Sequence, residues 1–356
     1  MGYKILYATK HSLSGAAASS QIMSQIKGFE LNLNTNFYAF IKDPKRLIHE
    51  NIRSKNLYSA ETNNSYLFFI RLFNFMLLNK EITMVYTRDL LVVLVSILLR
   101  KKCVYEIHKP PSRNGMIFIK FFKNFMKFVA ISENLKSYVS DELNVSKNSI
   151  LVAHDAVDFD LYESINFDKK TLRNKLDIAS KKKVALYTGT VGPHRDMKNF
   201  LDLIYKHENV DFFVLGDDGT NFKNLLNVDS FPKNLKFRGY LDKIEVSMYQ
   251  KSSDILLNLI EKSHPNINFC SQLKIFEYFA TGNITVTPDY GSLKEVINDK
   301  NSLIYSSNDS SNNLYNVFSK ALNANNTEYL TKNAKILVEK NTWKKRASKI
   351  IDFFNK

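Results

Sequence analysis

The sequence predicts an α/β protein built from two doubly wound domains, each with a parallel sheet covered by helices. Short runs rich in Val, Ile, Tyr and Phe alternate with helical segments through most of the 356 residues. This alternation is typical of βαβ units. The rhythm restarts after a polar, charged segment in the middle of the chain, and a chain of this length suits two domains of ordinary size.

Strands are predicted in the first half at "YKILYAT", "NFYAFI", "ITMVYT", "KCVYEIH" and "KFVAIS", with a helix over 17–29. In the second half they are predicted at "KKKVALYTGTV", "VDFFVLGD", "NLKFRGY", "DILLNLI", "NITVTPD" and "SLIYSS", with helices near 197–207 and around Glu277. We therefore expect a first domain over 1–165 and a second over 166–335. A C-terminal helix over 336–356 is expected to cross back to the first domain.

Composition and charge limit the classes of function. Hydrophobic residues make up 44% and charged residues 24% of the chain, which is typical of a packed protein. The net charge of +15 predicts attraction to a nucleic acid, an anionic lipid or a phosphorylated substrate. Because no helix-turn-helix, zinc-finger or RRM-like pattern occurs, we do not expect a nucleic acid partner. Cys103 and Cys270 lie far apart without metal-ligand spacing, which argues against disulfides or zinc.

The apolar stretches of the sequence indicate where in the cell the protein is expected. The N-terminus lacks the apolar core of a secretory signal, and the stretch "DLLVVLVSILL" is well short of the roughly 20 residues that span a bilayer, so we expect a cytoplasmic protein. In "MIFIKFFKNFMKF", Lys120, Lys123 and Lys127 recur at helical spacing among phenylalanines. With "SYLFFIRLFNFMLL", this predicts peripheral contact with an anionic inner membrane face; a core helix with an outer lysine stripe is the alternative.

The segment "NFCSQLKIFEYFATGNITVTPDYGSLKEVI" is the most informative part of the sequence. Its helix opens at the polar residues Cys270, Ser271 and Gln272, so backbone N–H groups and Lys274 can meet a phosphate there. Glu277, one to two turns further along, is suited to accept hydrogen bonds from ribose hydroxyls. An amphipathic helix with a solvated Glu277 explains the pattern equally well.

Three further places can line a ligand site at the carboxyl ends of strands. The loop "TKHSLSGAAASS" carries Ser14, Gly15 and Ala16, whose small size permits close approach; it is not GxGxxG and does not favour a nicotinamide enzyme. His108 follows the strand "CVYEI", where a purely structural histidine is the alternative. For His154 and Asp155, cleft lining and hinge packing are both compatible with the sequence.

Several motifs, in order along the chain, resemble glycosyltransferase family 4, the retaining enzymes of the GT-B fold. The segment "SQLKIFEYFATGNITV" resembles the family's C-terminal signature, and "ALYTGTVGPHRDMKNF", "FFVLGDD" and "LKFRGYLDKIEVSMYQKSSDILLNL" resemble its donor domain. In the first half, "VYEIHKP", "FVAISENLKSYV" and "ILVAHDAVDFDLY" resemble the acceptor side. An ordered series covering roughly three quarters of the chain is more specific than any single motif.

The resemblance implies two Rossmann-like domains facing a cleft, and transfer of a sugar, with retention, from a nucleotide-diphosphate sugar to a glycan or lipid-linked acceptor of a surface-polysaccharide or lipopolysaccharide pathway. Because no DxD motif follows a strand in a position to coordinate a metal diphosphate, and the cations of "HRDMK" and "SQLK" can take that role, we expect no tightly bound metal or other cofactor. His108, Lys198 and Lys274 are implied as catalytic, and Ser14, Gly15, Ala16, His154 and Asp155 as acceptor or cleft residues. The implied donor-binding residues are Gly189, Thr190, Arg195, Lys198, Gly239, Tyr240, Cys270, Ser271, Gln272, Leu273, Lys274 and Glu277.

The chain departs from the family pattern at two positions. Phe269 stands where the first glutamate of the family's E-x7-E motif is expected, and Thr190 where an arginine often follows the glycine. Arg195 is the candidate substitute, although Arg195 and Lys198 can also be solvated loop charges. A nucleotide-sugar epimerase on the same fold and a non-catalytic basic polyanion-binding protein remain as alternative functions.

Overall fold

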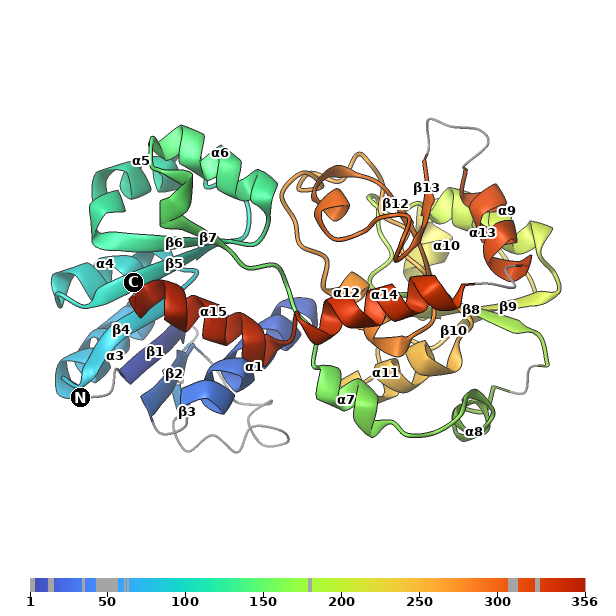
Figure 1. Ribbon diagram of the computed structural model, residues 1–356, viewed down its shortest axis with the longest axis horizontal. Coiled ribbons are helices and arrows are strands. Elements are labelled where there is room, and N and C mark those ends of the chain that lie inside the picture. Colours follow the sequence, from blue (N-terminus) through green and yellow to red (C-terminus); the bar gives the residue numbers. More distant parts are fainter. Residues whose placement is uncertain are drawn as a thin grey trace. The chain divides into compact units, whose positions relative to one another are not determined.

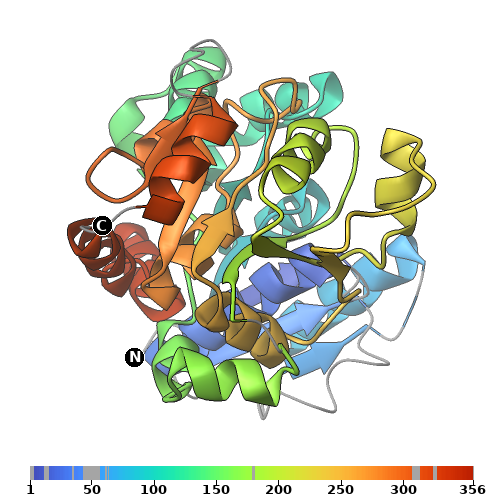
Figure 2. The ribbon, with the colours of Figure 1, turned by 90° about the vertical axis from the view of Figure 1, so that its right-hand side faces the viewer.

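The computed structural model describes residues 4–11, 16–33, 36–42, 57–60, 62, 64–178, 181–306, 313–323 and 327–355. The chain divides into two compact units. The first unit holds Met1–Asp155, Phe269–Ser271 and Thr342–Lys356, and the second holds Ala156–Asn268 and Gln272–Asn341. Each contains one parallel sheet flanked by helices (Figures 1 and 2), so the predicted α/β class with two doubly wound sheets is confirmed.

The first unit has a seven-stranded parallel sheet in the order β3-β2-β1-β4-β5-β6-β7. The order reverses between β1 and β4, which is where ligands bind in doubly wound sheets. The strands are β1 (Lys4–Thr9), β2 (Phe37–Ile41), β3 (Leu57–Ser59), β4 (Ile82–Thr87), β5 (Lys102–Ile107), β6 (Met126–Ala130) and β7 (Ile150–Val152).

Two sets of helices cover the faces of this sheet. Residues Ile5 and Tyr7 of β1 pack in the cluster that holds α1 (Ala16–Leu33) and α15 (Trp343–Asn355), whereas Leu6 and Ala8 pack toward α3 (Ser65–Leu78) and α4 (Leu90–Leu98). This alternation follows from the two-residue period of a strand. Helices α5 (Arg113–Phe122) and α6 (Glu133–Leu143) pack against β5 and β6 and form a third hydrophobic cluster with these strands.

Helix α15 packs along α1 in the first unit, as Figure 1 shows. Gly28 permits this close approach, because a Cβ there would overlap the carbonyl of Trp343. The side chains of Trp343, Ala347 and Ile350 are buried. The C-terminal segment is therefore part of the first unit, in agreement with the predicted crossing back.

The second unit has a six-stranded parallel sheet in the order β10-β9-β8-β11-β12-β13, with its reversal between β8 and β11. Its strands are β8 (Lys183–Thr188), β9 (Val210–Leu215), β10 (Leu235–Phe237), β11 (Ile255–Leu257), β12 (Ile284–Pro288) and β13 (Leu303–Tyr305). Its helices are α7 (Phe159–Ser164), α8 (Lys169–Lys175), α9 (Met197–Lys206), α10 (Thr220–Leu226), α11 (Lys243–Ser252), α12 (Leu273–Thr281), α13 (Leu314–Asn323) and α14 (Glu328–Glu339).

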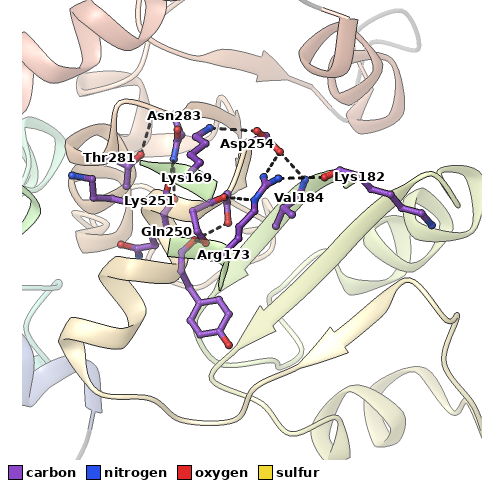
Figure 3. Close-up of polar contacts among 12 residues, drawn as sticks. Lys169, Arg173, Lys182, Val184, Gln250, Lys251, Asp254, Thr281 and Asn283 are labelled. Carbon is purple, nitrogen blue, oxygen red and sulfur yellow. Dashed lines mark hydrogen bonds and ion pairs between the residues drawn. The ribbon is translucent and has the colours of Figure 1, made fainter. Parts of the chain in front are cut away.

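An ion-pair network fixes α8 at the amino ends of β8 and β11 (Figure 3). The Asp254 carboxylate accepts from Arg173 Nη2 at 2.7 Å and from the Val184 backbone N–H at 2.8 Å, and Lys169 Nζ lies 3.4 Å away. Because every strand of this sheet is parallel, the network lies at the edge opposite the strands' carboxyl ends. It supports the sheet and leaves the ligand-binding edge open.

The structure draws the division between the units earlier than the expected 165/166. Helix α7 packs against α11 and α12, and the Tyr162 hydroxyl donates to Gln250 Oε1 at 2.5 Å, so the polar segment after Asp155 belongs to the second unit. The helix expected over 336–356 is also broken: α14 ends at Glu339 in the second unit and α15 begins at Trp343 in the first. The break lets Ala334 and Val338 pack in one core and Ala347 in the other.

The single interfacial helix predicted over "MIFIKFFKNFMKF" is wrong. Helix α5 ends at Phe122, a 3-10 turn follows over Lys123–Phe125, and Lys127 lies in β6. Phe128 is buried in the sheet, and Lys127 Nζ donates to the Phe353 carbonyl at 3.1 Å. The lysine periodicity therefore runs across a helix, a turn and a strand. No helix among the described residues has the length and apolar character needed to cross a bilayer.

Candidate active site

Three glycines lie at the carboxyl edge of the second sheet, after β8, β9 and β10. Gly189, Gly216 and Gly239 have φ of +129°, +100° and +63°, values that favour glycine. The Gly189 N–H donates to Leu215 O at 2.9 Å and the Gly216 N–H to Gly239 O at 2.7 Å. A Cβ on Gly216 would lie 2.7 Å from Gly189 O. Backbone hydrogen bonds thus join the ends of these strands, and no side chain lies between them. Sequence reasoning missed Gly216, although its position directly after the strand "FFVL" could have indicated it.

Lys274, in the first turn of α12, reaches this glycine edge. A Cβ added to Gly189 would lie 3.0 Å from Lys274 Nζ, so the absence of a side chain makes room for the ammonium. Nζ also lies 4.5 Å from the centre of the Tyr187 ring. Burial lowers the pKa of Lys274 well below its usual value, and the nearby charge of Arg195 lowers it further. A cation held in this way is stabilised by an incoming anion.

Arg195 lies in the loop that leaves β8. Its backbone pairs with Ile260 in an isolated antiparallel bridge, and its N–H donates to Gly192 O at 3.1 Å, which fixes the loop beside β11. Thr190 is exposed, and its carbonyl accepts from the Tyr187 hydroxyl at 2.9 Å. Lys198 is exposed in the first turn of α9. Of the two predicted loop cations, Arg195 is the one whose charge acts on Lys274.

Glu277 lies on α12 beside the reversal point of the sheet. The Tyr278 hydroxyl accepts from the Thr188 N–H at 3.0 Å and donates to Leu257 O at 3.2 Å, which joins the ends of β8 and β11. Glu277 is half-buried, and its Oε2 accepts from Gln250 Nε2 at 3.4 Å. The Gln250 amide therefore helps to orient the carboxylate, which also interacts electrostatically with Lys274. Sequence reasoning missed Gln250 and Tyr278.

The residues before α12 are divided between the units. Cys270 and Ser271 belong to the first unit, where Ser271 Oγ accepts from the Asp155 N–H at 2.8 Å. Gln272, which precedes the first helical residue Leu273, belongs to the second; its Nε2 is buried without a hydrogen bond to any described residue. Of the three polar residues predicted to open the helix, Cys270 and Ser271 thus belong to the first unit and only Gln272 belongs to the second.

Phe269, the position of the missing glutamate, has a packing role in the first unit. Its ring lies 5.4 Å from the ring of Tyr138, measured between centres, and its carbonyl accepts from Ser132 Oγ at 2.9 Å. In the second unit, Gly239 is followed by Tyr240, which is 67% exposed. Tyr240 therefore offers a free aromatic face next to the glycine edge.

In the first unit, His108 follows β5 at the carboxyl edge and is half-buried. Its Nε2 contacts Glu106 Oε1, and Arg346 Nη2 lies 3.1 Å from Glu106 Oε2. Burial disfavours the charged form of Glu106, but Arg346 and His108 together hold the pKa of its carboxyl at about 2. The ionised carboxylate therefore fixes the orientation of the His108 ring.

Arg346 also holds the chain on either side of His154. Its Nε donates to His154 O at 2.8 Å and its Nη2 to Ala153 O at 3.1 Å. Asp155 is buried, and its Oδ1 accepts from Gln21 Nε2 at 2.5 Å; burial raises the pKa of its carboxyl. Sequence reasoning missed Glu106 and Arg346.

The predicted acceptor loop is described only at its end. Ser14 and Gly15 lie outside the described residues, and Ala16 is the first residue of α1.

Comparison with known families finds a match in the second half of the chain. Residues 168–337 match the model of the family described as glycosyl transferases group 1. The matched segment contains the three strand-end glycines, Arg195, Lys274 and Glu277. Curated proteins include no significant sequence match to this chain.

Solved glycosyltransferases share the fold of the whole chain. A glycosyltransferase from Rickettsia africae is 15% identical with a TM-score of 0.79, over 99% of this chain and 98% of that one. Anabaena HepE, solved with UDP and glucose, is 14% identical with a TM-score of 0.76, over 99% and 100%. WaaG, a glycosyltransferase involved in lipopolysaccharide biosynthesis, is 12% identical with a TM-score of 0.70, over 98% and 99%. The predicted GT-B architecture of two Rossmann-like domains is confirmed.

Proposed function

We propose that this protein transfers a sugar from a nucleoside diphosphate sugar to an acceptor hydroxyl. The observation that carries the proposal is the pair of basic side chains, Lys274 and Arg195, beside the glycine edge of the segment that matches the group 1 glycosyltransferase model. A diphosphate there would gain two charge-assisted contacts and relieve the repulsion that lowers the pKa of Lys274.

The proposed chemistry is electrostatic stabilisation of the leaving group. As the glycosidic bond breaks, negative charge develops on the diphosphate, and preorganised cations stabilise that charge more than they stabilise the ground state. Lys274 and Arg195 take this role, so the reaction requires no tightly bound metal. Glu277, held by Gln250, accepts hydrogen bonds from the ribose hydroxyls.

His108 is proposed to assist on the acceptor side, and the transfer is proposed to retain the anomeric configuration, as the resemblance to the family implies. The Glu106 carboxylate keeps one ring nitrogen of His108 occupied, so the other nitrogen is available to a sugar hydroxyl. In this role His108 acts through polarity and not as a metal ligand.

The proposed donor nucleotide is UDP, because HepE was solved with UDP and UDP-glucose. The proposed acceptor is a glycan or lipid-linked intermediate of a surface polysaccharide or lipopolysaccharide, because WaaG and the galactosyltransferase WaaB share the fold. We propose that this reaction takes place at the cytoplasmic side of a membrane.

Release of nucleoside diphosphate tests the proposal. The protein is incubated with UDP-, GDP-, ADP- and CDP-linked sugars and lipid-linked glycans, with and without EDTA, and the anomeric signal of the product is recorded by NMR. We expect release with one base, unaffected by EDTA, lost in Lys274→Met and kept in Lys332→Met, an exposed lysine of α14. Isomerised donor without release would instead indicate an epimerase, and no consumption of any donor a polyanion-binding protein.

A further inference from the structure

The C-terminal ends of α3, α4 and α5 meet at one edge of the first unit. Each helix precedes a parallel strand of the same sheet, β4, β5 or β6, so each must end near the amino end of that strand. Contacts join α3 to α4 and α4 to α5, and Lys101 Nζ donates to Lys80 O at 3.0 Å. Figure 1 shows α3 and α4 at this side of the sheet.

This edge is apolar and exposed. Half of the exposed large hydrophobic side chains in the described part of the chain lie between Tyr66 and Phe125. At the helix ends, Leu78 is 81%, Leu98 64%, Phe121 77% and Phe125 60% exposed. Scattered apolar side chains are normal on a surface, but neighbouring ones on three successive helices mark an interaction site.

Basic side chains accompany the apolar ones. At the helix ends Lys80 and Arg100 are exposed and Lys101 is half-buried. Of the three carboxylates between residues 64 and 125, Asp89 and Glu106 are buried. The third, Glu81, is paired with Lys4 at 3.5 Å. We call this surface the apolar-basic edge; its apolar members are Leu77, Leu78, Leu98, Phe121 and Phe125, and its basic members Lys80, Arg100 and Lys101.

We propose that the apolar-basic edge docks on an anionic lipid bilayer. Apolar side chains enter the boundary between head groups and acyl chains, while the surrounding cations bind the head groups. A second copy of the chain fits less well, because two such edges would bring their positive charges together. A nucleic acid would use the cations and leave the aliphatic side chains without a partner.

The edge lies at the amino ends of the strands, whereas His108 lies after the carboxyl end of β5. Docking therefore leaves the carboxyl edge of the first sheet accessible. The proposal rests on exposure and charge alone, so it can succeed or fail whatever reaction the protein performs.

Vesicle flotation tests the proposal. The purified protein is mixed at low salt with vesicles of phosphatidylcholine alone or with about 30% phosphatidylglycerol, a content chosen to give a negative surface potential. We expect binding to the anionic vesicles only. Leu78→Ser combined with Phe121→Ser, and separately Lys80→Glu combined with Arg100→Glu, should each lower the partition coefficient by about tenfold or more.

The matched control is Tyr329→Ser with Lys332→Glu on α14 of the second unit, which removes one exposed aromatic and one exposed lysine elsewhere. We expect it to bind like the wild type. Unchanged circular dichroism and melting temperature in all variants show that they are folded. Absence of binding to anionic vesicles by the wild type, or equal binding by the Leu78/Phe121 variant, would overturn the proposal.

Discussion

Arg346 Nη2 lies 3.1 Å from Glu106 Oε2 in the interior of the first unit. The arginine comes from the C-terminal helix α15 and the glutamate from β5, two residues before His108. The same guanidinium holds the carbonyls of Ala153 and His154. One side chain thus joins the C-terminal helix to the strand that precedes His108 and to the backbone at His154.

Arg346→Met is expected to destabilise the first unit. Removing Arg346 leaves the buried Glu106 carboxylate without its guanidinium partner and with His108 still beside it, and the loss of one partner of a buried ion pair costs about 3–5 kcal/mol. Urea unfolding measures the change. Lys349→Met, on an exposed position of the same helix, is the control and should change the free energy of unfolding by less than about 0.5 kcal/mol. Equal effects of the two substitutions would contradict the assigned role of Arg346.

The Glu106 carboxyl should make stability depend on pH in the acid range. Its folded pKa is about 2, below the value near 4.3 of an unfolded glutamate, so the unfolded state binds more protons between these values. The stabilisation is therefore complete above about pH 4.3 and is lost as the pH falls toward 2. The stability difference between the wild type and the Glu106→Gln, Arg346→Met double variant should shrink over this range. A constant difference would show that Glu106 does not titrate there.

Gly189→Ala should impair nucleotide binding, whereas Gly192→Ala should not. An alanine at φ +129° is strained by about 1–3 kcal/mol, and its Cβ would lie 3.0 Å from Lys274 Nζ. Around a Cβ at Gly192 no atom of the described chain lies within 4 Å. We expect calorimetric titration with UDP to show about tenfold weaker binding for Gly189→Ala than for the wild type. A tenfold loss of affinity corresponds to about 1.4 kcal/mol, which lies within the range of such strain. Equal affinities would show that the Lys274 position does not depend on Gly189.

Lys274 should take up a proton when a diphosphate binds. Burial and Arg195 lower the pKa of the free lysine, and a phosphate group beside it raises the pKa again. Affinity for UDP should therefore fall as the pH rises through the pKa of the free lysine. Titration calorimetry in buffers of different ionisation enthalpy measures the uptake directly. Lys274→Met should abolish it, and uptake that persists in this variant would assign the proton to another group.

Periodicity was sufficient to predict the six strands of the second sheet and five of the seven strands of the first, because buried strands bounded by turn residues are a local signal. It missed the three-residue strands β3 and β7. At "MIFIKFFKNFMKF" it allowed two overlapping interpretations, a helix with recurring lysines and the strand "KFVAIS", and the structure has the strand at Lys127 and Phe128. It also missed the break at 340–342, since both flanking helices are amphipathic and the break depends on which core each one covers.

Among the residues that the structure brings to the carboxyl edge of the second sheet, only those in motifs that are continuous in sequence were named from the sequence. Gly189, Arg195, Lys274 and Glu277 lie within the resembling segments. The Glu106–Arg346 pair joins residues far apart in the chain, so the sequence alone gives no reason to connect them. Gln250 and Tyr278 were missed because their polar atoms matter only once β8, β11 and α12 are packed together.

Nucleotide binding by the second unit tests the central claim most directly. Melting temperatures are measured with UDP, GDP, ADP and CDP for the wild type, Glu277→Ala, Lys274→Met and the control Gly192→Ala, because a ligand of the folded state raises the melting temperature. The account predicts that UDP stabilises the wild type and Gly192→Ala but neither of the other two variants. No stabilisation by any nucleotide, or equal stabilisation of all four proteins, would contradict it.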